Sequence, residues 1–202
     1  MRLYLIRHAQ PDYPGGKRMC LGQKTDLPLS AAGFEQARQL SALLRTLPLH
    51  AVYTSPMLRA QQTAGYIAGD SLPLLSLPDL IELHGGEWDG LTFDEIHVRY
   101  PDYFRGVRPS CPPGGESDEQ GLTRALSALQ TICALNQDCA AVAHGAIIRA
   151  LLCHLLHRPM SEKKNIPQDC AAVNILDFDE GVWTVRAINL SLEELRRHIH
   201  GA

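Results

Sequence analysis

Four side chains in this sequence have the types and positions needed to bind and attack an anion. Arg7 and His8 follow the apolar run LYLI, Arg59 follows VYTSPML, and His144 ends the apolar run CAAVA. The imidazole of histidine can offer a lone pair or a proton near neutral pH. The planar guanidinium group of arginine binds phosphate or carboxylate through paired N–H donors. Two histidines and two arginines of this kind predict chemistry on a phosphoryl group.

The elements that must position these side chains alternate between strands and helices. Near-continuous apolar runs predict strands at residues 2–7, 51–55, 139–145, 173–179 and 182–188. Amphipathic stretches between them predict helices, the first of which has Ser30 as its N-cap. This order predicts the α/β class, a three-layer sandwich with a mostly parallel sheet flanked by helices. The last two strands read as a hairpin that turns at residues 179–181, so we expect one antiparallel edge.

Short local patterns mark where other helices begin. Ser55 and Pro56 fit the N-cap and the first helical position of the helix that carries Arg59. Three more helices are predicted from capping boxes, in which Ser or Thr is followed three residues later by Glu or Gln. These boxes are Thr92 with Glu95, Ser117 with Gln120, and Ser191 with Glu194.

The carboxyl edge of the predicted sheet is where the four side chains would meet. Ligands of open α/β sheets bind outside the carboxyl ends of the strands, which is where Arg7, His8 and His144 fall. Arg59 lies in the first turn of a helix that begins at the same edge, and helix N-termini favour anions. Each residue alone has a plainer interpretation: His144 as a core histidine, Arg59 as a solvated helix residue. Their common edge favours a phosphoryl site.

Residues 93–120 differ from the rest of the chain in composition, with prolines, arginines and the run CPPGGES. We interpret this region as a small insertion that caps the active site, within a single domain of residues 1–202. A long surface loop is the alternative. Arg105 and Arg108 are candidates for binding a second negative group on a substrate, unless they are solvated.

Composition excludes several classes of function. The 202 residues carry a formal net charge of −3, which disfavours a nucleic-acid partner. No apolar run is long enough to span a membrane. None of the six cysteines forms a C-x-x-C pair, so we expect a cytoplasmic protein with reduced thiols. The sequence leaves the oligomeric state open, a homodimer being one alternative.

The ordered motifs of this chain resemble those of the histidine phosphatase superfamily, also called the phosphoglycerate mutase-like family. The segments that carry the resemblance are LIRHAQ, DLPLSAAGFEQA, VYTSPMLRAQQTA, LIELHGGEWDGLT, PPGGES and VAHGAIIRALL. The resemblance covers residues 2–189. It implies that His8 is a nucleophile that becomes transiently phosphorylated. It also implies that Arg7, Arg59 and His144 bind the phosphoryl group, and that Glu82 protonates the leaving oxygen.

These implied roles agree with the physical chemistry of phosphoryl transfer. A neutral His8 can attack phosphorus, and the arginines with a protonated His144 would neutralise charge on the phosphoryl oxygens. Glu82 would then act as base when water hydrolyses the phosphohistidine. No metal or other cofactor is expected. A mononuclear metal site that includes His84 is the alternative, which two nearby arginines would oppose.

The chain departs from the family pattern near the nucleophile. Ala9 stands where glycine is usual, Pro11 where threonine is frequent, and Pro14 where many members have a phosphate-binding asparagine. Gln10 is a candidate replacement for that asparagine. Ala146 makes the second histidine motif HGA rather than the commoner HGG.

The predicted function is that of a phosphomonoesterase acting on a small phosphorylated metabolite. The run G-x-x-T-D-L-P-L-S at residues 22–30 resembles α-ribazole-phosphatase-like members, so α-ribazole 5′-phosphate is a candidate substrate. One alternative is a phosphoglycerate mutase, which usually needs a longer enclosing insertion. Another is a catalytically retired phosphate-binding regulatory protein, which the departures at residues 9, 11 and 14 would favour.

Overall fold

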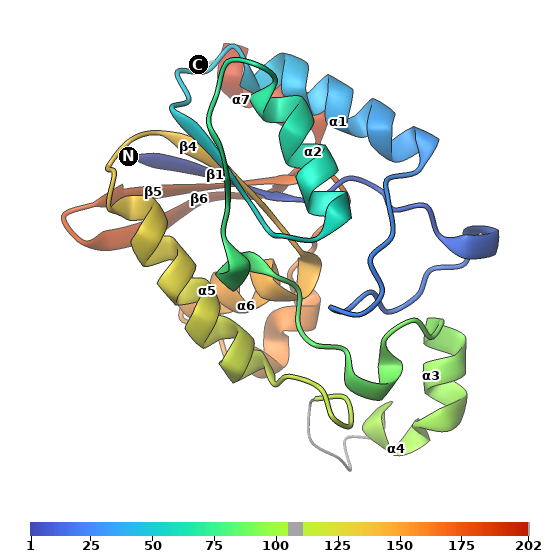
Figure 1. Ribbon diagram of the computed structural model, residues 1–202. Helices are drawn as coiled ribbons and strands as arrows, with labels where there is room; N and C mark the ends of the chain where they lie inside the picture. The colour runs from blue at the N-terminus through green and yellow to red at the C-terminus, as the bar shows by residue number, and fades with distance from the viewer. Residues whose placement is uncertain (105–110, 202) are drawn as a thin grey trace.

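One six-stranded sheet forms the centre of the molecule (Figure 1). The computed structural model describes residues 1–104 and 111–201. The strand order is β3-β2-β4-β1-β5-β6. The strands are β1 (Arg2–Arg7), β2 (Ala51–Thr54), β3 (Leu74–Ser76), β4 (Cys139–Ala143), β5 (Val173–Asp179) and β6 (Val182–Leu190).

The sheet is parallel on one side and antiparallel on the other. β1 pairs in parallel with β4, β4 with β2, and β2 with β3, whereas β5 is antiparallel to β1 and β6. Glu180 and Gly181 form the β5–β6 turn with φ values of 46° and 85°, the backbone that tight hairpins favour. The predicted α/β class and its antiparallel edge are therefore confirmed.

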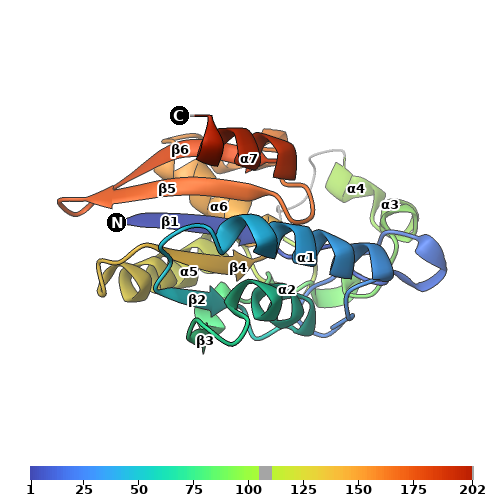
Figure 2. The same ribbon diagram turned by 90° about the horizontal axis from the view of Figure 1, so that it is seen from above.

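Helices cover both faces of the sheet and make three layers (Figures 1 and 2). One face packs on α1 (Ala31–Leu44), α2 (Leu58–Ala68) and α7 (Leu192–His200), and the other on α5 (Asp118–Cys133) and α6 (Gly145–Leu155). Successive side chains of a strand point to opposite faces, so Ile6 of β1 joins the first core and Leu5 the second. β1 is thereby fixed from both sides, which makes its carboxyl end a rigid support.

Residues 93–104 form two short helices away from these layers, α3 (Phe93–Arg99) and α4 (Pro101–Phe104). Figure 2 shows them beyond the carboxyl ends of the parallel strands. Short 3-10 turns occur at Pro14–Gly16, Pro78–Leu80, Gly86–Trp88 and Met160–Asn165. Residues 93–104 thus lie on the side of the sheet where the sequence predicted a site.

Most local predictions are confirmed and two are wrong. Ser30 caps α1, and all three capping boxes form. The sequence did not predict β3, because three exposed residues after a proline give too short a pattern. The predicted start of α2 at Ser55 is also wrong. The helix begins at Leu58 with Met57 as N-cap, and Ser55 has other partners.

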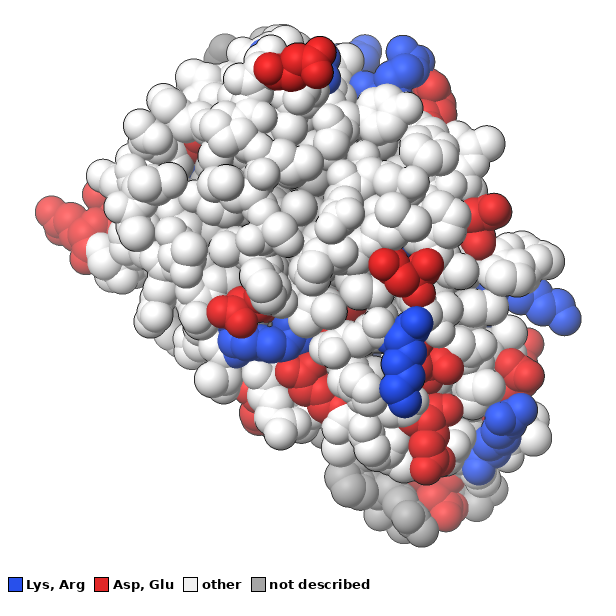
Figure 3. Space-filling model, in the orientation of Figure 1, with Lys and Arg blue, Asp and Glu red and all other residues white. Residues whose placement is uncertain are grey.

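The surface carries mixed charges. Figure 3 shows acidic and basic residues interspersed on one face, without a broad basic area. Within the part of the chain that the structure describes, no helix is both long and apolar enough to cross a membrane.

Candidate active site

A cavity of about 300 Å³ opens at the carboxyl ends of the parallel strands. Arg7, His8 and Glu82 line it, and the first residues of α6 form part of its wall. The ring of His144 lies 5.1 Å from the ring of His8, centroid to centroid. Arg59 is fully buried, and its Nη2 donates to the carbonyl oxygen of Gly22, a residue that lines the cavity. The structure therefore brings together all five residues that the sequence selected.

His8 is held in one tautomer at the end of β1. Its Nδ1 lies 2.8 Å from the carbonyl oxygen of Ala9, and because a carbonyl can only accept, Nδ1 carries the proton. Nε2 therefore keeps its lone pair. Burial, together with the charges of Arg59 and Arg7, lowers the pKa of His8 well below its ordinary value. The arrangement supplies a neutral, oriented imidazole, which is what a nucleophile requires.

His144 is buried beside it and is held by Ser55. Its Nε2 lies 2.6 Å from the Oγ of Ser55. That oxygen accepts a hydrogen bond from the backbone N–H of Met57, and we assign its hydroxyl proton to the contact with Nε2. In this tautomer Nδ1 carries the proton, and Nδ1 has no partner among the described residues.

The sequence predicted a protonated His144 beside a bound phosphoryl group, and burial in the free protein opposes that charge. Burial, Arg59, His8 and Arg7 lower the pKa of His144 well below its ordinary value. The neutral ring still presents an N–H at Nδ1. His144 can therefore donate a hydrogen bond to an anion without first gaining a proton.

The two predicted arginines also hold unused donors. Arg7 donates from Nη1 to the carbonyl of Gln168 at 2.5 Å, and Arg59 reaches surrounding acceptors only at 3.3–3.4 Å. Over residues 1–104 and 111–201, the buried Nε atoms of both arginines lack a hydrogen-bond partner. Buried polar atoms are normally paired, so these donors, with Nδ1 of His144, form a vacant set suited to an anion.

Glu82 faces the cavity and is fixed by backbone groups. Its two carboxylate oxygens accept hydrogen bonds from the N–H of Leu83 at 2.9 Å and of Ala146 at 3.2 Å. Ala146 lies in the first turn of α6, so the departure from the HGG motif leaves this backbone donor in place. The carboxyl group is thus held in one orientation at the cavity wall.

Arg124, which the sequence analysis missed, clamps the segment that carries Glu82. Its guanidinium group forms a two-pronged ion pair with Glu116 at 2.8 Å and donates to the carbonyls of Asp79, Ile81 and Glu82. Ser55, considered only as a helix cap, was missed as the partner of His144. The sequence does not indicate these contacts, because Arg124 fits an ordinary amphipathic helix and Ser55 fits an ordinary helix cap.

The departures near the nucleophile have different structural outcomes. Ala9 is buried and supplies the carbonyl that orients His8. Pro11 pairs with Leu29 in an isolated bridge. Pro14 begins a 3-10 turn, and Gln10 lines a neighbouring hollow rather than the cavity of His8. The structure therefore gives no support to Gln10 as the replacement ligand. Arg105 and Arg108 lie outside the described residues.

The described residues were also compared with the requirements of a metal site. The described part of the chain has no group of three or more His, Cys, Asp or Glu residues positioned to hold a metal ion. Nδ1 of His84, the residue considered for such a site, accepts a hydrogen bond from the N–H of Gly86 at 3.2 Å.

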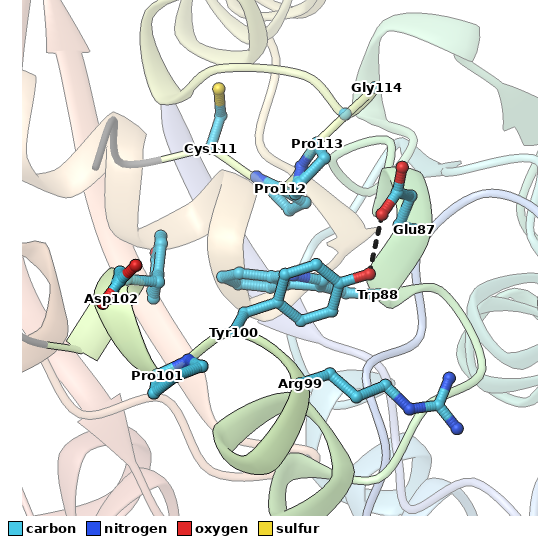
Figure 4. A pocket seen from close by; sticks show the side chains of 12 residues that line it. Glu87, Trp88, Arg99, Tyr100, Pro101, Asp102, Cys111, Pro112, Pro113 and Gly114 are labelled. Carbon is cyan, nitrogen blue, oxygen red and sulfur yellow. Dashed lines mark hydrogen bonds between the residues drawn. The ribbon is translucent and has the colours of Figure 1, made fainter. Parts of the chain in front are cut away.

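The region of residues 93–120 contributes to the cavity wall. Phe93, Tyr103, Pro112 and Glu116 line the cavity together with Trp88. A larger hollow of about 540 Å³ adjoins it and shares Trp88, Tyr103 and Pro112 (Figure 4). That hollow holds neither histidine of the site nor Glu82, so the chemistry belongs to the smaller cavity.

Proteins with sequences similar to this chain include phosphatases. The chain is 29% identical over 191 residues to the phosphatase PhoE of Bacillus subtilis, with 93% of each chain covered. It is 25% identical over 197 residues to the adenosylcobalamin/alpha-ribazole phosphatase of Salmonella typhimurium, covering 94% of this chain and 96% of that one.

A solved structure agrees over the whole fold. The mycobacterial glucosyl-3-phosphoglycerate phosphatase Rv2419c in complex with VO3 matches with a TM-score of 0.84 at 29% identity, over 94% of this chain and 99% of that one. The family model described as "Histidine phosphatase superfamily (branch 1)" matches residues 3–191. The chain therefore belongs to branch 1 of the histidine phosphatase superfamily.

Proposed function

We propose that this protein is a phosphomonoesterase that works through a phosphohistidine on His8 and needs no metal. One observation carries the proposal: three buried donors without partners belong to residues grouped with an imidazole whose tautomer is fixed. These donors are the Nε atoms of Arg7 and Arg59 and Nδ1 of His144. A phosphoryl group offers three oxygens to such a set, and phosphoryl transfer depends mainly on positioning and charge stabilisation.

In the first step, Nε2 of His8 attacks phosphorus from the side opposite the leaving oxygen. The N–P bond forms as the P–O bond to the leaving group breaks, and Glu82 in its protonated form donates the proton that the leaving oxygen takes up. The carbonyl of Ala9 continues to accept from Nδ1, which stabilises the positive charge that the ring acquires.

In the second step, Glu82 accepts a proton from water as the water oxygen attacks phosphorus. The N–P bond breaks, inorganic phosphate forms, and His8 regains its lone pair. The N–H donors of the first step stabilise the same phosphoryl oxygens again, so one pocket serves both half-reactions.

Within this function, we propose residues 93–120 as the cap of a single domain and the source of substrate discrimination. Several residues of this region line the cavity, which supports the assignment. The Salmonella relative supports α-ribazole 5′-phosphate as one candidate substrate. The mycobacterial structure supports a different class, in which the phosphate ester also carries an acid.

The test is hydrolysis of 4-nitrophenyl phosphate in the presence of EDTA. We expect the wild type to release phosphate with the chelator present, and His8→Ala to lose turnover. The exposed His154 of α6 provides a matched control, since His154→Ala should retain the wild-type rate.

Other outcomes would identify the alternatives. Activity that EDTA abolishes and zinc or magnesium restores would contradict the metal-free mechanism. Isomerisation of 3-phosphoglycerate faster than phosphate release would identify a mutase. Tight phosphate binding by the wild type without turnover of any phosphomonoester would identify a retired binding protein.

A further inference from the structure

A second hollow, of about 390 Å³, lies beside the cavity of His8. The two share four lining residues, Arg7, Tyr13, Arg18 and Arg149. The phosphoryl pocket and the second hollow are therefore parts of one continuous recess, with the Arg7 side chain between them.

The guanidinium groups of Arg7 and Arg149 lie side by side at this junction. An ideal Cβ placed on Gly145 would be 3.3 Å from Nε of Arg7 and 3.1 Å from Nη1 of Arg149. Arg149 is half-buried and is anchored by its Nε, which donates to the carbonyl of Ile166 at 2.8 Å. This anchor leaves the outer edge of its guanidinium group facing the recess.

These arginines have no directly paired carboxylate in the part of the chain that the structure describes. Within the described residues, none of Arg7, Arg18 and Arg149 takes part in an ion pair. The one acidic residue of the hollow, Asp169, accepts instead from the side-chain amide of Asn189 at 2.9 Å. Like charges held together in a half-buried recess repel one another unless an anion joins them.

Arg149 lines the cavity of His8 as well as the second hollow. The cations that lower the pKa of His8 are Arg59 and Arg7. Burial and the charges of Arg7 and Arg18 lower the pKa of Arg149, and the carboxylates of Glu82 and Asp169 only partly oppose that shift. Since the phosphoryl group has its own donors, Arg149 and Arg18 are available for a different part of the substrate.

We propose that Arg149, with Arg18, binds a second acidic group of the substrate, a carboxylate or another phosphate. The inference rests on the proposed phosphatase function and names its substrate class: a small phosphomonoester with an acid close to the ester. It disfavours α-ribazole 5′-phosphate, which has no acidic group besides its phosphate. The guanidinium fork matches either acid in a two-pronged geometry.

Two matched substrate pairs test this proposal. 3-Phosphoglycerate and sn-glycerol 3-phosphate differ by a carboxylate, and fructose 1,6-bisphosphate and fructose 6-phosphate differ by a second phosphate. We expect kcat/KM to favour the acidic member of at least one pair, and the pair shows which acid is bound. Arg149→Gln should lower that preference about tenfold or more, as expected for a lost charged hydrogen bond, and Arg149→Lys should restore part of it.

Arg18→Gln keeps the test decisive if Arg149→Gln fails to fold, because the exposed Arg18 makes no hydrogen bond within the described residues. It should lower the same preference. Arg158→Gln, an exposed change beyond α6, is the matched control and should leave the preference intact. An equal loss on both members of a pair, or no preference in the wild type, would overturn the subsite.

Failure of the phosphatase function is distinguishable from failure of the subsite. Calorimetry with His8→Ala measures binding of the same substrate pairs without any turnover. The subsite predicts tighter binding of the acidic member, and loss of the difference when Arg149→Gln is added. If the wild type hydrolyses no phosphomonoester but this difference is present, only the proposed function fails. Equal binding of both members overturns the subsite.

Discussion

The sheet edge and the insertion of residues 93–120 meet at one cavity, but they constrain it in different ways. The sheet edge supplies buried groups on rigid supports, with His8, Arg59 and His144 each at most 3% exposed. The insertion supplies half-buried or exposed side chains such as Tyr103 and Phe93. A buried charged or imidazole side chain is held by a few fixed neighbours, whereas an exposed side chain can change its contacts. We infer from this difference that the sheet edge carries the proposed reaction and that the residues around it select the substrate.

The largest expected effect that tests this division comes from Glu82→Gln. It removes the transferable proton, so kcat for an alkyl phosphate such as glycerol 3-phosphate should fall about 10²- to 10⁴-fold. The loss in the formation of the phosphohistidine should be smaller for 4-nitrophenyl phosphate, because that leaving group needs little protonation. Pre-steady-state release of the leaving group (glycerol or nitrophenol) from both substrates, compared with the exposed control Glu119→Gln, is the measurement. An equal, small loss on both would contradict the role of Glu82.

A smaller effect is expected from Arg124→Lys, which acts through Glu82. The lysine keeps the charge near Glu116 but cannot reach the backbone carbonyls as the guanidinium group does. We expect kcat for alkyl phosphates to fall about 10- to 100-fold, the cost of a misplaced catalytic group. The dependence on leaving group should follow that of Glu82→Gln. A loss independent of the leaving group would indicate a purely structural role.

Stability against pH tests the burial of the two histidines. Both have pKa values in the folded protein below that of an unfolded histidine, near 6.5. The unfolded state therefore binds more protons as pH falls below about 6.5, so this contribution is present above that pH and lost below it. Each histidine adds a slope approaching about 1.4 kcal/mol per pH unit. Urea unfolding at several pH values should show a shallower slope in His144→Gln. An unchanged slope would contradict the burial.

The smallest effect on folding is expected from Phe93→Ala in the insertion. Phe93 lines the cavity and is 44% exposed, so the free energy of unfolding should change by about 0.5 kcal/mol or less. The relative kcat/KM for bulky and small aryl phosphates should shift severalfold. A large loss on every substrate would place the insertion within the reaction machinery and break the comparison.

The fold and the positions of the candidate site residues could be predicted because their signals are local. Apolar runs give β1 and β4, the side chains at their ends are His8 and His144, and capping boxes begin three helices. Contacts between distant segments left no such signal. Ser55 bonds to a histidine 89 residues away, and Arg124 holds a loop more than 40 residues away. Neither residue type is distinctive at its position in the sequence.

The lowered pKa of His144 and the hollow beside Arg7 could not be inferred from the sequence either. Protonation follows from burial and from neighbouring charges, and both exist only once the chain is folded. The junction of Arg7 with Arg149 joins the end of β1 to the second turn of α6. Spacing along the chain does not indicate that these two guanidinium groups are adjacent.

The central claim is that His8 carries the phosphoryl group during turnover. The most direct measurement uses Glu82→Gln with 4-nitrophenyl phosphate, because this variant should form the intermediate and hydrolyse it slowly. Rapid quenching under alkaline conditions, followed by peptide mass spectrometry, then locates the phosphate. The account predicts an acid-labile, base-stable phosphate on His8, and none in the His8→Ala, Glu82→Gln double variant. A phosphate on another residue, or a burst of nitrophenol without phosphate on His8, would contradict it.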